Sequence, residues 1–365
     1  MKTVAHSLQC GVTKLVSPIQ TPSRFRRAVS TAVVLVVVGA VFGGLVALPA
    51  SAPVANAQPR DSIWEVRTQL IDSFSEIATA QLDGKIYVIG GYPQTRRYVD
   101  TVQVYDPATR TWSHTTPVPQ PLHHTVAVGA NGKVYVLGGE ISNDGFANQG
   151  FYLDTLYAYD PATATWAQRA SMPTARGGGA AAVIGTKIYL AGGRPPGGAD
   201  FAVYDTEADT WTRLPDLPTQ RNHLAATAIG GKVYVAGGRF GGGVGSEMTD
   251  RLEIFDPATN TWSQGAPLLE PRAGLNGMAV NGCFYTWGGE GNAPHPLGIF
   301  PNNEVYNPVT NTWHALEPIP VPVHGVTGGA TLDGYIHLAG GGISRGGSSG
   351  ATLHQAFRAE MNCAS

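Results

Sequence analysis

Basic side chains recur at a nearly constant distance before pairs of glycines in this chain of 365 residues. They lie fifteen or sixteen positions before the first glycine of a pair, and they are Arg176, Arg221, Arg272, His324 and His123. Guanidinium groups bind carboxylates through two parallel hydrogen bonds. The pattern therefore favours binding of a carboxylate, either on an acidic sugar or on a peptide.

A second set of charged residues follows the glycine pairs, in predicted loops of variable length. The set consists of Arg96, Arg97, Glu140, Arg194, Arg239 and Glu290. Together the two sets predict a partly electropositive pocket with acidic positions. Recurrent Arg176, Arg221 and Arg272 could equally cap backbone carbonyls between the repeats, because repetition also favours a scaffold role. The sequence leaves both roles open.

The glycine pairs themselves end six copies of one short apolar pattern, which predicts a β-strand. The copies span 85–91, 133–139, 187–193, 232–238, 283–289 and 335–341. In the first copy, Gly90 and Gly91 end the strand Lys85-Ile-Tyr-Val-Ile, with no helix pattern behind them. We therefore expect these glycines to allow close packing of strands and not to cradle a phosphate.

Each of the first five copies is followed by an aromatic residue and, seven positions later, by a tryptophan. The pairs are Tyr105 and Trp112, Tyr159 and Trp166, Tyr204 and Trp211, Phe255 and Trp262, and Tyr306 and Trp313. Turn residues such as Asp106-Pro107 lie between the two members of a pair, so each unit contains several strands. Because the spacing never varies, we expect these aromatic rings to pack between repeats and not to stack on a ligand.

The period and residue pattern resemble the kelch repeat, a four-stranded propeller blade, from residue 62 to about 358. The resemblance implies an all-β fold, a six-bladed kelch-type β-propeller. The last unit lacks its tryptophan strand, whereas Trp64 lies 48 residues before Trp112 with no glycine pair ahead of it. We therefore expect the segment around Trp64 to complete the last blade and close the ring.

In such a blade the four strands, A to D from the axis outward, are antiparallel, so the B–C and D–A loops share one face. The variable loops and the charged residues above gather on this face, at the mouth of the central channel. Because function concentrates on variable loops, we expect the ligand to bind there.

The first 57 residues carry five basic and no acidic side chains, and an apolar run from 28 to 50 precedes Ala55-Asn56-Ala57. This order predicts a signal peptide or an N-terminal membrane anchor over 1–57, with a single propeller over 58–365. We expect a protein that is secreted, periplasmic or at the cell surface, and a membrane tether is the alternative to release. Of the two cysteines beyond the leader, Cys283 and Cys363, pairing is possible, but a buried unpaired Cys283 is favoured.

The remaining chain carries 19 basic against 26 acidic side chains without a basic stripe, which argues against nucleic acid as a partner. The scattered histidines show no metal-site spacing, so we predict no metal and no cofactor. In this respect the chain departs from galactose oxidase, whose propeller it resembles and whose copper site needs tyrosines and histidines.

Exported N-acetylneuraminate epimerase resembles this chain in size and blade number. That resemblance implies an acid–base glutamate beside a glycine pair, a place that Glu140 and Glu290 occupy here, and an arginine. Neither loop contains an arginine, so Arg176 or Arg272 would have to supply one from a neighbouring blade, with Glu290 and Arg272 as the favoured pair. We favour a monomeric binding module for a protein segment or glycan over this sialic-acid epimerase (mutarotase) alternative.

Overall fold

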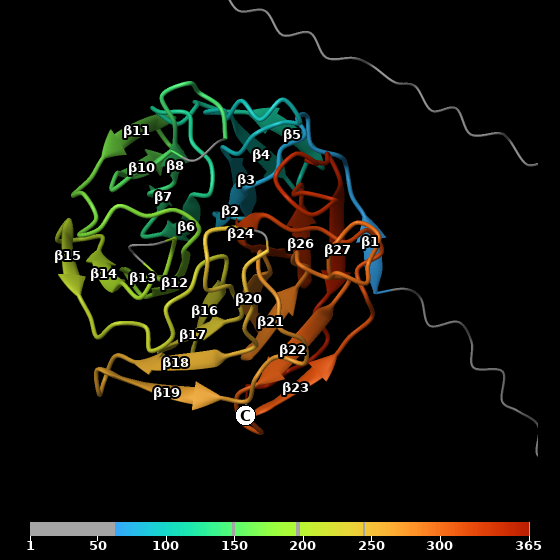
Figure 1. Cartoon of the computed structure of the whole chain (residues 1–365). Helices are drawn as coiled ribbons and strands as arrows, with labels where there is room; N and C mark the ends of the chain where they lie inside the picture. Colours follow the sequence, from blue (N-terminus) through green and yellow to red (C-terminus); the bar gives the residue numbers. More distant parts are fainter. Residues whose placement is uncertain (1–62, 148–149, 195–197, 244, 365) are drawn as a thin grey trace, which may run out of the picture. The chain divides into compact units, whose positions relative to one another are not determined.

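The computed structural model describes residues 63–147, 150–194, 198–243 and 245–364. Within these ranges every regular element is a β-strand, and six antiparallel sheets surround a central axis (Figure 1). The predicted all-β fold and six-bladed propeller are confirmed. The described ranges contain no helix that could cross a membrane, and the expected leader over 1–57 lies outside them.

Blades 1 to 3 each contain four strands that follow the chain order from the axis outward. Blade 1 contains β2 (Ile77–Leu82), β3 (Lys85–Ile89), β4 (Val102–Asp106) and β5 (Thr111–His114). Blade 2 contains β6 (Val126–Ala130), β7 (Lys133–Leu137), β10 (Leu156–Asp160) and β11 (Thr165–Gln168), with a small hairpin of β8 (Glu140–Ile141) and β9 (Phe151–Tyr152) in its loop. Blade 3 contains β12 (Ala180–Ile184), β13 (Lys187–Ala191), β14 (Phe201–Asp205) and β15 (Thr210–Arg213).

Blades 4 and 5 repeat this order, and blade 6 combines both ends of the described chain. Blade 4 contains β16 (Ala225–Ile229), β17 (Lys232–Ala236), β18 (Leu252–Asp256) and β19 (Thr261–Gly265). Blade 5 contains β20 (Asn276–Val280), β21 (Cys283–Trp287), β22 (Asn303–Asn307) and β23 (Thr312–Ala315). Blade 6 contains β25 (Ala330–Leu332), β26 (Tyr335–Ala339), β27 (His354–Arg358) and β1 (Trp64–Val66).

Two pairings join segments from the two ends of the described chain. Strand β1 pairs antiparallel with β27, with Trp64 opposite Phe357. Strand β24 (Val326–Gly328), which leads into β25, pairs parallel with β2 of blade 1. Because these contacts join segments from opposite ends of the described chain, they satisfy backbone groups that two open sheet edges would expose.

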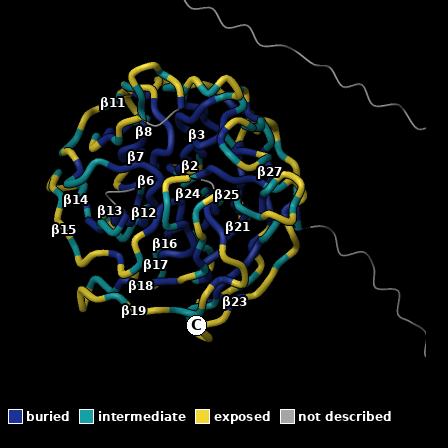
Figure 2. Tube along the Cα trace, in the orientation of Figure 1, coloured by how far each residue is buried: buried dark blue, intermediate teal, exposed yellow. Residues whose placement is uncertain are grey.

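Apolar side chains pack between neighbouring blades. Figure 2 shows that the inner strands of the ring are mostly buried. Each repeated tryptophan lies opposite the aromatic residue of its pair on the neighbouring strand. For example, Tyr204 lies opposite Trp211, and their ring centroids are 5.2 Å apart. The indole nitrogen of Trp211 also donates to the carbonyl of Ala170, before the blade begins. Trp64, Trp112, Trp166, Trp262 and Trp313 make the corresponding bond. Each indole thus ties its blade to the preceding segment.

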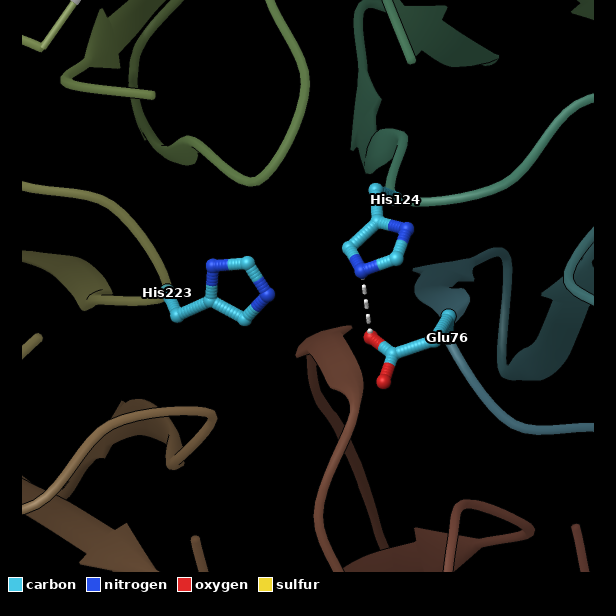
Figure 3. Close-up of side chains that lie close together, drawn as sticks. All are labelled: Glu76, His124 and His223. Atoms are coloured by element: carbon cyan, nitrogen blue, oxygen red, sulfur yellow. Dashed lines mark ion pairs between the residues drawn. The ribbon is translucent and has the colours of Figure 1, made fainter. Parts of the chain in front are cut away.

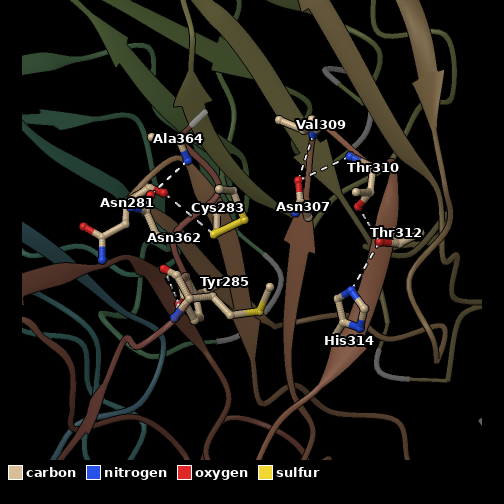
Figure 4. Close-up of a disulfide and its surroundings, with 12 residues drawn as sticks. Asn281, Cys283, Tyr285, Asn307, Val309, Thr310, Thr312, His314, Asn362 and Ala364 are labelled. Carbon is tan, nitrogen blue, oxygen red and sulfur yellow. Dashed lines mark hydrogen bonds between the residues drawn. A yellow bond between two sulfur atoms is a disulfide. The ribbon is translucent and has the colours of Figure 1, made fainter.

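The cysteine expectation was wrong, because Cys283 and Cys363 form a disulfide (Figure 4). After β27 the chain runs back to the A–B turn of blade 5, where the Cys363 amide donates to the carbonyl of Asn281 over 2.8 Å. This places the two Cα atoms 5.1 Å apart. The sequence favoured an unpaired Cys283 because it does not encode where the C-terminal segment docks.

Candidate functional site

Six residues, each just before or at the start of an innermost strand, form a ring around the axis. They are Glu76, His124, Gly178, His223, Gly274 and Gly325. The His124 amide donates to the Glu76 carbonyl over 3.1 Å, and the same bond repeats between successive blades at 2.7 to 3.3 Å. The amide of Ile77, next to Glu76, completes the cycle on the carbonyl of Gly325. We call these six positions the inner ring.

Every inner-ring residue has a positive φ, between 51° and 67°. Glycine adopts this backbone at little cost, whereas Glu76, His124 and His223 occupy a region that other residues rarely enter. The glycines leave room for their neighbours: a Cβ on Gly178 would lie 3.1 Å from the His223 ring, and one on Gly325 would lie 2.9 Å from the Glu76 carboxylate. Three blades therefore carry functional side chains where the other three carry none.

An outer ring is formed by the residue after each glycine pair. Its members are Tyr92, Glu140, Arg194, Arg239, Glu290 and Gly342. Backbone hydrogen bonds hold each member against the start of strand A, as between Glu140 and His123 at 2.8 and 3.2 Å. The glycine pair and this pairing together aim the outer-ring side chains at the axis on the B–C and D–A loop face.

Both rings contribute to a cavity of about 510 Å³ on this face. Its charged and aromatic lining consists of Glu76, Tyr92, Arg96, His123, His124, Glu140, Arg194, Arg239 and Glu290. Glycines 242, 243, 346 and 347 and Ala147 form the rest. The cavity is thus polar, with a backbone-lined rim.

Two buried ion pairs cross between blades in the outer ring. Arg194 Nε lies 2.9 Å from Glu140 Oε1, and Arg239 donates to Glu290 Oε1 over 2.6 Å. Glu290 Oε2 also accepts from the amide of Gly346 at 2.9 Å. Both carboxylates are at most 5% exposed, so low dielectric strengthens the attraction and fixes both arginines in the cavity wall.

The cavity shifts several pKa values in different directions. Burial raises the pKa of Glu140 to about 7 in spite of Arg194. Burial also raises the pKa of Glu76. For Glu290, burial acts upward, but attraction by His324 and Arg239 leaves its pKa below the ordinary value. Burial and then Arg194 lower the pKa of His123 to about 3. The site therefore combines neutral imidazoles, one ionised carboxylate and one carboxyl that titrates near neutral pH.

The structure brings most of the expected loop residues together. Arg96, His123, Glu140, Arg194, Arg239 and Glu290 all line the cavity. His324 lies beside it, with Nδ1 3.7 Å from Glu290 Oε2 and 3.9 Å from Glu76 Oε1. Arg97 is exposed and does not line the cavity.

The three recurrent arginines do not lie at the channel mouth, where we expected them, and instead bind backbone carbonyls, which is the scaffold role that the sequence left open. Arg176, Arg221 and Arg272 are at most 2% exposed and do not line the cavity. Arg221 donates to the carbonyls of Gly237 and Val235 and to the carboxylate of Glu253.

The other two arginines are also directed into their own blades. Arg272 binds Glu304 Oε1 at 2.8 Å and Thr286 at 2.9 Å, and Arg176 binds the Asp200 carbonyl at 2.7 Å. These arginines therefore recur because each one hydrogen-bonds to the end of strand B in its blade. Arg221 and Arg272 also bind a carboxylate on strand C.

Sequence reasoning missed Glu76, Tyr92, His124 and His223 as members of one site. An alignment of the six repeats could have found them, because the position just before strand A holds glycine in three repeats and Glu or His in the other three. His123 and His324 belong to the position before that column, one residue after the arginines, because both pair with the outer ring.

The fold and the loop-face cavity define a repeat propeller with a polar central site, and comparison with known proteins identifies its family. The KLHDC2/KLHL20/DRC7 Kelch-repeats domain matches residues 62–238 and 169–341. The chain therefore belongs to the kelch-repeat family, as the resemblance implied.

Three named relatives illustrate the range of the family. Kelch-like protein terF of Aspergillus terreus is 32% identical over 76% of this chain and 62% of its own length. Beta-scruin of Limulus polyphemus and human Kelch-like protein 23 are each 26% identical over 72% of this chain, covering 24% and 45% of their own lengths. The chain thus spans less than two thirds of each of these relatives.

A solved structure titled "Structure of YjhT" has a TM-score of 0.65 with 15% identity, covering 82% of this chain and 98% of that one. At this identity the likeness concerns the fold.

Proposed function

We propose that this kelch propeller is a monomeric binding module outside the cytoplasm, and that its B–C and D–A loop face takes a carboxylate-bearing protein segment or acidic glycan. A kelch propeller is consistent with a protein-interaction module in general. The observation that carries the finer proposal is the cavity of about 510 Å³ with Arg96, Arg194 and Arg239 in its wall.

The charge arrangement suits an anion. The guanidinium groups of Arg194 and Arg239 are held by Glu140 and Glu290, so their positions are set before a ligand arrives. Arg239 Nε has no hydrogen-bond partner among the described residues and is buried, which leaves a donor for a ligand oxygen. A preorganised guanidinium loses little freedom when it binds a carboxylate.

The location rests on two observations. The basic and apolar segment of residues 1–57 has the order of an export signal or anchor. The Cys283–Cys363 disulfide supports an oxidising compartment, because such bonds persist mainly in exported proteins. The alternatives are release and membrane tethering, which fractionation of the expressing cells would separate.

Binding can be tested by calorimetry with two matched ligand pairs: sialic acid against its methyl ester, and a peptide with a free C-terminal carboxylate against its amide. We expect binding of at least one charged member and loss of about tenfold or more in Arg194→Lys, which keeps the charge but loses the fork. Arg213→Lys is the control, because Arg213 is 61% exposed on β15. Equal binding of charged and uncharged members would contradict the proposal.

A second candidate function, proton transfer during anomer exchange of an acidic sugar, is favoured by Glu140. A carboxyl with a pKa of about 7 suits general acid–base chemistry at neutral pH, and Arg194 lies 2.9 Å away to hold a substrate carboxylate. The expected pairing of Glu290 with Arg272 does not occur, since Arg272 is bonded to Glu304 inside blade 5. The test is the rate of anomer exchange by NMR, which Glu140→Gln should reduce to the uncatalysed value.

A further inference from the structure

Three side chains of the inner ring converge on one point, and two of them, Glu76 and His124, also line the cavity. Figure 3 shows the Glu76 carboxylate and the His124 and His223 rings directed toward a common space. One donor atom from each lies within 4.8 Å of the others, and each residue is 5 to 7% exposed. They come from blades 1, 2 and 4, so the propeller axis is what brings them together.

The hydrogen bonds around His223 decide which of its ring nitrogens carries a lone pair. The Asn222 amide nitrogen donates to the carbonyls of Arg239 and Gly241, at 3.3 and 2.9 Å, which fixes Oδ1 as the acceptor. That Oδ1 lies 2.6 Å from His223 Nδ1, so Nδ1 donates. His223 Nε2 is therefore an acceptor, and it is buried without a hydrogen-bond partner among the described residues.

His124 presents an acceptor to the same space. Arg194 can only donate, and its Nη2 lies 3.1 Å from His124 Nε2, so Nε2 carries a lone pair. His124 Nδ1 is hydrogen-bonded to His123 Nδ1, a support on the far side of the ring. Glu76 Oε2 lies 3.1 Å from His124 Nε2. The His124 lone pair and the Glu76 oxygen are therefore close enough to ligate one positive centre together.

We propose that Glu76, His124 and His223 bind a divalent first-row transition-metal ion at the inner ring, next to the loop-face cavity. Two imidazoles and one carboxylate are donors that Zn²⁺, Co²⁺, Ni²⁺ and Fe²⁺ accept. His223 donates its other ring nitrogen to Asn222, and His124 hydrogen-bonds to His123, which is the support that metal-binding histidines commonly have.

The geometry requires only a small adjustment. Metal–ligand bonds of about 2.0 to 2.2 Å place neighbouring donor atoms roughly 3 to 3.5 Å apart. The His124 and Glu76 atoms already have this separation. Since all three atoms lie within 4.8 Å of one another, the His223 atom needs to move inward by less than about 2 Å.

The inner-ring backbone supports a ligand role over a packing role. A residue other than glycine at positive φ is costly, and the repeat uses glycine at this position in three blades. Packing alone would be served by glycine, which relieves the strain. Glu76, His124 and His223 thus occupy a backbone conformation that favours glycine, and their metal-binding atoms lie close together there.

The test uses purified protein without a polyhistidine tag, treated with a chelator and titrated with Co²⁺ or Zn²⁺. We expect one tightly bound ion per chain by elemental analysis, visible Co²⁺ absorbance, and a rise in melting temperature. His223→Gly installs the residue that Gly178, Gly274 and Gly325 already use, so it should fold. Its affinity for Co²⁺ should fall by more than about 100-fold, which exceeds the loss of affinity expected when only a residue that supports a metal ligand is removed.

Two further variants keep the result unambiguous. His223→Asn retains a residue that tolerates positive φ and should also lose Co²⁺, whereas His314→Ala on exposed β23 should bind it as the parent does. The proposal is overturned if the parent binds neither ion, or if His223→Gly and Glu76→Gln bind Co²⁺ as tightly as the parent. Anion binding is measured separately on chelator-treated protein. The metal proposal and the anion-binding proposal are therefore tested by independent data, and failure of one does not decide the other.

Discussion

Replacing Arg221 with methionine should destabilise the propeller without removing a cavity residue. The side chains of Arg221 and its partner Glu253 are both 0% exposed. Arg221 also donates to three carbonyls, including those of Gly237 at 2.8 Å and Thr219 at 2.8 Å. In Arg221→Met these carbonyls lose a donor, and among the described residues the buried Glu253 carboxylate keeps the hydrogen bond from the Thr219 hydroxyl, 2.7 Å away.

The expected cost is about 3 to 5 kcal/mol, the usual effect of removing one partner of a buried ion pair. Urea unfolding, followed by tryptophan fluorescence, measures it. In the double variant Arg221→Met with Glu253→Leu the uncompensated charge is gone, so we expect a large part of the lost stability to return. Arg213→Met is the control and should change the free energy of unfolding by less than about 1 kcal/mol, because Arg213 is 61% exposed.

A different result would indicate that these arginines bind the ligand and do not serve the scaffold. If Arg221→Met and Arg272→Met each lost less than about 1 kcal/mol while anion binding disappeared, the scaffold role inferred from their buried contacts would be refuted. Unchanged anion binding with reduced stability is the outcome that the contacts predict.

Three other effects should be measurable. Burial lowers the pKa of His337 to about 4 and of His354 to about 3. Below pH 6.5 the unfolded chain therefore binds more protons than the folded chain, and the free energy of unfolding falls as the pH drops toward 4. Each of the two histidines contributes about 1 kcal/mol per pH unit to this fall. His354→Gln should flatten this slope in urea unfolding at a series of pH values, and an unchanged slope would contradict the assignment. Cys363→Ser opens a crosslink between Cys283 and Cys363 with a sequence separation of 80, and should cost up to about 4.5 kcal/mol in non-reducing urea, a difference that reductant should abolish. Trp262→Phe should cost about 1 kcal/mol in thermal unfolding for its lost indole hydrogen bond, and an unchanged melting temperature would count against the inter-blade tie.

The repeat pattern was sufficient to predict the six blades and most of the charged and aromatic residues in the cavity wall. A residue directly after a glycine pair has its position set by the pair and by strand B, so Glu140, Arg194, Arg239 and Glu290 could be assigned to one face from spacing alone. Spacing does not give side-chain direction. Arg221 occupies its predicted place in the repeat, but the carbonyls at the end of strand B and the carboxylate of Glu253 draw it into the blade.

The metal-ligand cluster could not be read from spacing in the same way. Glu76 and His223 are 147 positions apart, and only closure of the ring brings them to one point. No local motif encodes that distance. The disulfide had the same difficulty, since the docking of Cys363 on blade 5 depends on the path of the last few residues.

The cycle of backbone bonds through Glu76, His124, Gly178, His223, Gly274 and Gly325 divides the space along the axis. The charged cavity lies on one side of it, and on the other lies a separate space of about 260 Å³, lined by the small residues of the innermost strands. Glu76 and His124 line the charged cavity, whereas no inner-ring residue lines the second space. A ligand held in the charged cavity therefore meets the inner ring from the loop face, and one held among the innermost strands would not touch it.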